Sequence, residues 1–141
     1  MRLFARLRAD ERGSTVIEFA ILAPTLFMMM FGVLAMGLRL ANANALQSAA
    51  ADTARWTVVE YQKANKEDTE SIEDQARAYA INTPYNLDID RLSVQVTSVT
   101  TDVVGTTKLK IYMTYTPYNP LEFAGLASPL LQNTRYVYVD D

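Results

Sequence analysis

Residues 13–38 read GSTVIEFAILAPTLFMMMFGVLAMGL, and this stretch decides the fold of the 141-residue chain. From Phe19 to Leu38 it holds twenty residues without a formal charge, with Pro24 as the one helix breaker. A helix rises about 1.5 Å per residue, so the run covers about 30 Å, which is the thickness of the hydrocarbon core of a bilayer. The sequence therefore predicts a transmembrane helix over residues 14–39.

The charges on the two sides of this run predict its orientation. Residues 1–13 carry four arginines and two acidic residues, a net charge of +2, so a total charge of −3 leaves −5 for the rest of the chain. An excess of positive charge marks the cytoplasmic flank of a membrane helix. We therefore expect a single-pass protein with a cytoplasmic N-terminus and an acidic extracytoplasmic part, for which nucleic acid is not an expected partner.

Cysteine and histidine are both absent. Without cysteine, the extracytoplasmic part must be stabilised by its core rather than by disulfides. Without histidine, the chain lacks the commonest general base and the commonest metal ligand. Its serines, threonines and carboxylates do not group into a nucleophile with a base, a phosphate-binding loop or a metal site. We therefore expect no enzymatic activity, no cofactor and no metal.

Residues 40–66 are predicted to continue the helix beyond the membrane. Small and apolar residues recur there at steps of three and four, the pattern of one buried helix face. These residues are Leu40, Ala43, Leu46, Ala50, Ala54, Thr57, Val58 and Tyr61. No strong breaker separates them from the span, so we expect one rod of about fifty residues that is kinked or loosened at Pro24.

The same region leaves an alternative open. Ala41-Asn42-Ala43 and Ala43-Asn44-Ala45 have the small-x-small pattern that signal peptidase cuts. Cleavage there would release a secreted product without an anchor. The alanines are equally good residues for continuing the helix.

Residues 67–141 are predicted to form a small domain that begins with a helix. Ser71 and Asp74 fit a capping pattern, and Asn82-Thr83-Pro84 is expected to end this helix near Ile81. The acidic segment before it, residues 63–74, lacks the spaced ligands and the glycine of a calcium loop, so we interpret it as a solvated turn and helix start.

The remainder of this domain alternates between apolar and polar residues, which predicts strands. One strand is expected around residues 92–96 and a second around residues 109–115, joined by a loop over residues 102–107. A short helix is expected between Pro120 and Pro129, followed by a third strand at Thr134–Val139. The predicted fold class is therefore α+β, with a long N-terminal helix followed by a small three-stranded antiparallel sheet and short helices.

Glu18 is a carboxylate at the front edge of the apolar run, and no basic residue follows it before Arg39. A charge costs about 3 kcal/mol at the bilayer centre and less near the interface, so Glu18 calls for a cation. Cleavage after Gly13 would give Ser14 an ammonium group, which the Glu18 of a neighbouring parallel helix would pair. Alternatively, Glu18 faces water or head groups near its helix N-terminus, where a negative charge is favoured. The residues alone leave both interpretations open.

A short arginine-rich leader, Gly13, Ser14 and Glu18-Phe19 ahead of an apolar helix resemble the leader motif of type IV prepilins. More specifically, ERGSTVIEFAILAPTL (residues 11–26) resembles the TadE-like minor pilins, or pseudopilins, of tight-adherence (Tad/Flp) pilus systems. The resemblance continues through ALQSAAADTARW (residues 45–56) and, more weakly, through residues 115–121. It implies a leader over residues 1–13, cleavage by prepilin peptidase between Gly13 and Ser14, and a role for Glu18 and Phe19 in assembly.

The resemblance implies a structural role at the bacterial cytoplasmic (inner) membrane. Such a pilin would be incorporated at low copy into an adhesive pilus, or would prime one. Its partners would be prepilin peptidase, other pilin subunits, the pilus assembly platform and the membrane. Small residues around Gly32 and Gly37 would let membrane helices approach one another closely. The alternative is a membrane-anchored extracytoplasmic binding module whose helix is a passive tether.

Overall fold

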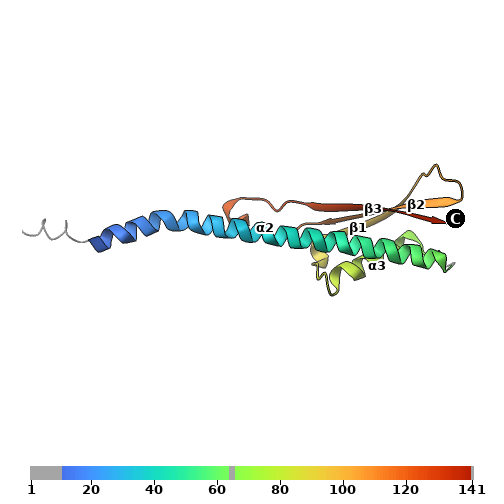
Figure 1. Ribbon diagram of the computed structural model, residues 1–141, viewed down its shortest axis with the longest axis horizontal. Coiled ribbons are helices and arrows are strands. Elements are labelled where there is room, and N and C mark those ends of the chain that lie inside the picture. Colours follow the sequence, from blue (N-terminus) through green and yellow to red (C-terminus); the bar gives the residue numbers. More distant parts are fainter. Residues whose placement is uncertain (1–10, 64–65, 141) are drawn as a thin grey trace, which may run out of the picture.

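The computed structural model describes residues 11–63 and 66–140. Its elements, in chain order, are α2 (Glu11–Gln62), α3 (Thr69–Ile81), the 3-10 turn η1 (Ile89–Arg91), β1 (Leu92–Val99), β2 (Thr106–Tyr115), the 3-10 turn η2 (Glu122–Ala124) and β3 (Leu131–Asp140). Figure 1 shows α2 as a long rod, with α3 and the sheet gathered along its C-terminal half. The predicted α+β class is confirmed. Most of the predicted leader, residues 1–10, lies outside the described residues.

α2 is a single helix of 52 residues, about 78 Å long at 1.5 Å per residue. It continues through Pro24, and the part that holds this residue is gently curved in Figure 1 rather than broken. The predicted continuous rod is therefore confirmed. The helix ends at Gln62, before the predicted end, where the N–H of Lys63 is shared between the carbonyls of Val59 and Glu60 at 3.2 and 3.0 Å.

The buried face of α2 matches the predicted stripe in part. Leu46, Ala50 and Thr57 are buried, whereas Leu40 is 62 % exposed and was wrongly included, because the core packs on α2 only from Ala43 onward. Two fully buried residues, Ala49 and Thr53, were not predicted. The Thr53 and Thr57 hydroxyls donate to the carbonyls of Ala49 and Thr53 at 2.8 and 2.9 Å, so both polar groups are satisfied inside the helix.

α3 begins earlier than the sequence predicted. Asp68, rather than Ser71, is the N-cap, and its carboxylate accepts a hydrogen bond of 2.8 Å from the backbone N–H of Ser71. Ser71, which was expected to be the cap, instead supplies the N–H that is capped. The predicted end at Ile81 is confirmed, with Asn82 as the C-cap and a cis peptide bond between Thr83 and Pro84.

The sheet has the order β1-β2-β3, and both pairs are antiparallel. The alternation over residues 92–96 and 109–115 predicted the buried face of the first two strands correctly except at Leu92, which is only partly buried. The buried positions are Val94, Val96, Leu109, Ile111, Met113 and Tyr115. The loop between β1 and β2 ends at Gly105, two residues before its predicted end, because Thr106 and Thr107 already belong to β2. Gly105 has a φ of 77°, which favours glycine. β3 is longer than predicted because residues 131–133 also pair with β2.

The segment between β2 and β3 differs most from the prediction. The expected helix between Pro120 and Pro129 is wrong, since only the single turn η2 forms there. The side chain of Asn119 replaces helical hydrogen bonds, because its Nδ2 donates to the carbonyls of Leu126 and Ala127 at 2.8 and 3.3 Å. These bonds close the segment into a loop.

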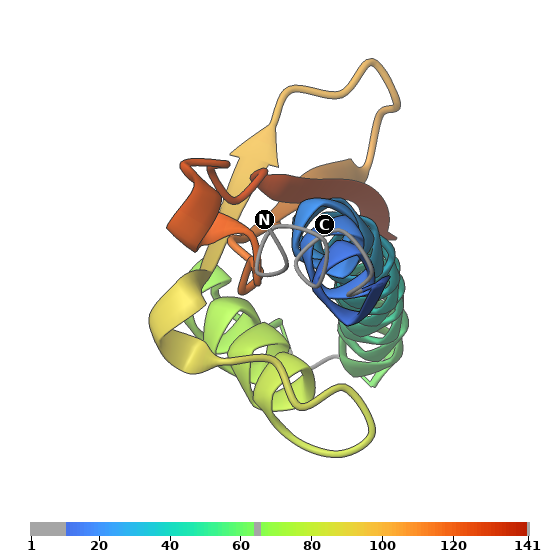
Figure 2. The ribbon, with the colours of Figure 1, turned by 90° about the vertical axis from the view of Figure 1, so that its left-hand side faces the viewer.

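The core lies between one face of the sheet and the two helices. α2 packs under β3 and α3 packs under β1, and the helices also contact each other. Figure 2, viewed along the rod, shows α2 and α3 side by side beneath the strands. Leu46 of α2, Ile72 of α3 and Ile111 of β2 are fully or almost fully buried and join the three parts of this core. The C-terminal half of α2 is therefore part of the folded domain.

Candidate membrane and assembly surface

The N-terminal half of α2 exposes apolar side chains along its length. Its most apolar 18-residue window has none of its residues buried, and the helix is long and apolar enough to cross a membrane. Its exposed large apolar residues include Val16, Ile17, Phe19, Ile21, Leu22, Leu26, Phe27, Met29, Met30, Val33, Leu34 and Met36. Exposure of this extent in water would be costly, so the structure supports a single-pass membrane anchor.

The structure places the predicted processing and assembly residues on this same half. Gly13 and Ser14 lie in the first turn of α2. Glu18 follows Ser14 by four residues, which is about one helical turn. The side chains of Glu18 and Phe19 are exposed. Their roles in cleavage and assembly stay predictions.

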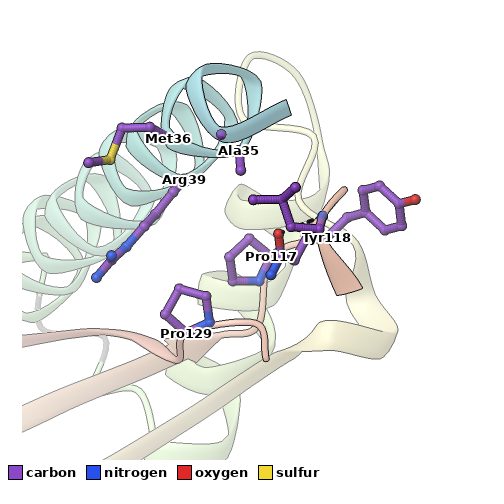
Figure 3. Close-up of a pocket in the computed structure, with 9 residues that line it drawn as sticks. Ala35, Met36, Arg39, Pro117, Tyr118 and Pro129 are labelled. Carbon is purple, nitrogen blue, oxygen red and sulfur yellow. Dashed lines mark hydrogen bonds between the residues drawn. The ribbon is translucent and has the colours of Figure 1, made fainter. Parts of the chain in front are cut away.

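A long loop between β2 and β3, residues 116–130, folds back against α2. Together they form a pocket of about 220 Å³ lined by Gly32, Ala35, Met36, Arg39, Pro117, Tyr118, Asn119, Leu121 and Pro129. Figure 3 shows Ala35 and Arg39 on the helix side, with Pro117 and Pro129 on the loop side. Its lining is largely apolar, and Arg39 brings the one cation among these residues.

An aromatic pair fixes the loop to the helix beyond this pocket. The rings of Phe31 and Phe123 meet edge to face, with centroids 6.1 Å apart and an interplanar angle of 77°. Such contacts between aromatic rings are favourable. The β2–β3 loop therefore touches the predicted transmembrane run itself.

The comparison with protein families gives a match that lies entirely within α2. Residues 13–55 match the model of the TadE-like protein family. The resemblance stated from the sequence is thus confirmed over this segment, which begins at Gly13 and ends within the buried part of α2. No match was found among curated proteins or among solved structures.

The TadE-like segment (residues 13–55) also makes a polar contact with the connection between α3 and η1. The Tyr85 hydroxyl donates to Asp52 Oδ2 at 2.6 Å. This hydrogen bond is the main cause that raises the pKa of Tyr85 above its usual value, and partial burial of the phenol is the second cause. Arg55 lies 3.8 Å from the other carboxylate oxygen of Asp52. The contact ties α2 to the connection that follows α3.

Two acidic residues of segment 63–74, Asp68 and Glu73, have structural roles. The backbone N–H of Ser71 lowers the pKa of Asp68 by its hydrogen bond to the carboxylate. Glu73 accepts from the backbone N–H of Val96 at 2.8 Å and pairs with Arg77 at 3.1 Å, which links α3 to β1. Within residues 11–63 and 66–140, no group of three or more acidic residues is arranged to hold a metal ion.

A shallow groove lies between the C-terminal part of α2 and β3. Ala54, Val58 and Val59 line one wall, and Tyr136 and Tyr138 line the other. The ammonium of Lys108 lies 4.5 Å and 5.4 Å from the two tyrosine ring centroids. The pairing of β2 with β3 brings Lys108 next to the two tyrosines, which no local sequence pattern reveals.

Sequence analysis also missed the contact between the β2–β3 loop and α2. The contact joins residues about ninety positions apart, so no periodicity reveals it. One signal was present in the composition, since three of the five prolines of the chain lie between residues 117 and 129. Such a density of proline argues against a helix and for an irregular loop.

Proposed function

We propose that this protein is a structural subunit of a tight-adherence type IV pilus system. It is inserted in the bacterial cytoplasmic membrane by α2, processed by prepilin peptidase after Gly13, and incorporated at low copy into a pilus or its priming complex. Its partners are other pilin subunits and the assembly platform. It acts by packing and not by catalysis.

The observation that carries this proposal is the TadE-like match over residues 13–55. The matched segment coincides with a helix whose first half exposes apolar side chains and whose second half is built into the core. A helix of this kind can exchange a lipid environment for the neighbouring helices of a filament, while the domain stays folded around its other end. Glu18 and Phe19 lie on the part that would change its surroundings.

The proposal is tested by the N-terminal sequence of the mature protein. The full chain is expressed in a bacterial host together with a prepilin peptidase, purified from the membrane and sequenced. We expect Ser14 as the first residue, and we expect Met1 when the peptidase is inactive or when Gly13→Val blocks the cut. A start near Leu46 would instead indicate signal-peptidase cleavage, and an uncut chain in the presence of active peptidase would contradict the pilin assignment.

A further inference from the structure

The β2–β3 loop contacts α2 within the apolar run that is predicted to cross the membrane, so the loop cannot lie wholly in water. Its Phe123 contacts Phe31 of α2, and Phe31 precedes Arg39, the first charged residue after the apolar run, by eight residues. Eight residues of helix correspond to about 12 Å. The loop therefore reaches well past the end of the apolar run, toward its middle.

If the loop lay in water, the part of α2 left to cross the membrane would be too short. The hydrocarbon would have to end before Phe31, and the uncharged residues 19–30 cover only about 18 Å of helix. A bilayer has a hydrocarbon core of about 30 Å, and tilting the helix shortens its reach further. We propose that the β2–β3 loop inserts into the outer leaflet beside α2, with lipid as its partner. This inference rests on the membrane anchoring in the proposed function.

The side chains of the loop suit a lipid environment. Phe123, Leu126 and Leu130 are 73 %, 50 % and 55 % exposed, although they are apolar. Tyr118, also exposed, is of the residue type that gathers at the level of the head groups. Arg39 is exposed beside the loop at the end of the apolar run, where a long basic side chain reaches the lipid phosphates.

The backbone of the loop satisfies many of its own polar groups, as hydrocarbon requires. The Asn119 side chain holds the carbonyls of Leu126 and Ala127 and accepts from the N–H of Leu121 at 3.0 Å. Three further N–H groups donate to carbonyls within the loop in and around η2. Pro117, Pro120 and Pro129 carry no N–H that would need a partner.

Glu122 limits how deep the loop lies. It is the one charged residue between residues 116 and 130, and its side chain is exposed. A carboxylate is costly at the bilayer centre and much less so at the interface. The loop therefore stops short of the bilayer centre and stays within the outer leaflet.

The test uses fluorescent labels on single cysteines, since the chain has none of its own. The full chain is reconstituted in phosphatidylcholine–phosphatidylglycerol vesicles, with and without lipids that carry a nitroxide quencher near the head of the acyl chain. Leu126→Cys reports on the loop and Met29→Cys on the span. Val104→Cys is the matched aqueous control, because Val104 is 99 % exposed in the β1–β2 loop, at the end of the domain opposite the N-terminal half of α2 (Figure 1).

We expect the label at Leu126 to emit at shorter wavelength than the label at Val104 and to lose fluorescence to the lipid quencher. An aqueous emission without quenching at Leu126, together with quenching at Met29, would overturn the inference and leave the membrane anchor intact. Absence of quenching at both Met29 and Leu126 would overturn the anchor as well. A shifted but unquenched label at Leu126 would show that protein covers the loop, which also overturns the inference.

Discussion

Single side chains connect α2 to the rest of the domain, and Tyr85 is the clearest case. It follows α3, yet its hydroxyl lies 2.6 Å from a carboxylate oxygen of Asp52 on α2. The hydrogen bond needs the neutral phenol, which supplies the proton. It is therefore a contact whose contribution to stability depends on pH.

The pH dependence follows from the direction of the shift. Hydrogen bonding to Asp52 raises the pKa of Tyr85 above 10.0 in the folded chain, so its stabilisation is complete below pH 10 and is lost as the pH rises through the folded pKa. We expect Tyr85→Phe to lower the free energy of unfolding by at most about 1 kcal/mol at neutral pH, because the pair is partly exposed. The difference from the parent chain should shrink above pH 10.

Thermal unfolding of the full chain in detergent, followed by circular dichroism at neutral and alkaline pH, measures this effect. Tyr118→Phe is the matched control, because Tyr118 is 61 % exposed and the variant should behave like the parent. A loss of stability in Tyr85→Phe that stays the same across this pH range would contradict a role for the hydrogen bond.

At the scale of elements, the C-terminal half of α2 packs through small residues. Ala49 and Ala50 are fully buried, which lets the backbone of α2 come close to α3 and the sheet. A tightly packed position of this kind has no room for a larger side chain. In this part of the core, the backbone of α2 itself lies close to its neighbours, because the side chains between them are small.

This packing predicts the result of enlarging one alanine. Ala50→Leu should lower the free energy of unfolding by about 1–3 kcal/mol, because extra methylene groups force the packed elements apart. Ala41→Leu, on the exposed side of the same helix, should change it by less than about 0.5 kcal/mol. Denaturant unfolding of the full chain in detergent compares the two variants, and equal stabilities would show that α2 does not pack closely at Ala50.

The same elements show what the sequence allowed us to predict. β1 and β2 were predictable because their core positions carry large apolar residues at every second place, as at Val94 and Ile111. Ala49 and Thr53 were missed because a small residue and a hydroxyl carry little hydrophobic signal, although both are fully buried. The cap of α3 was misplaced because several residues near Asp68 are suitable caps, and local sequence does not choose among them.

The candidate surface was predictable only in its local part. The apolar run, Gly13 and Glu18 are consecutive features of one helix, so composition and spacing identify them. The β2–β3 loop was expected to be helical, because its apolar residues do not reveal that Asn119 bonds to residues seven and eight positions ahead. Its contact with Phe31 depends on how the sheet packs on α2, which no local pattern contains.

At the scale of the whole molecule, the two halves of α2 have different surroundings. Its N-terminal half exposes apolar side chains, whereas residues from Ala43 onward belong to the core with the sheet and α3 (Figure 1). In the proposed function, the folded domain would stay intact while the apolar half moved from lipid to a protein assembly. Glu18 is the one charged residue between Gly13 and Arg39, and its surroundings would differ between lipid and an assembly.

The last prediction separates insertion from assembly at Glu18. Glu18→Ala removes a charge from the membrane end of α2, so insertion should be unchanged or slightly favoured. Incorporation into filaments should fall, because the ammonium of Ser14 on a neighbouring processed subunit would lose its carboxylate partner. The measurements are the amounts of variant in the membrane fraction and in sheared pili. Glu18→Asp should retain part of the incorporation, and Glu70→Ala, which removes an exposed carboxylate from the domain, should retain all of it. Equal incorporation of Glu18→Ala and Glu70→Ala would show that the carboxylate has no role in assembly, and failure of Glu18→Ala to reach the membrane would place its role before assembly.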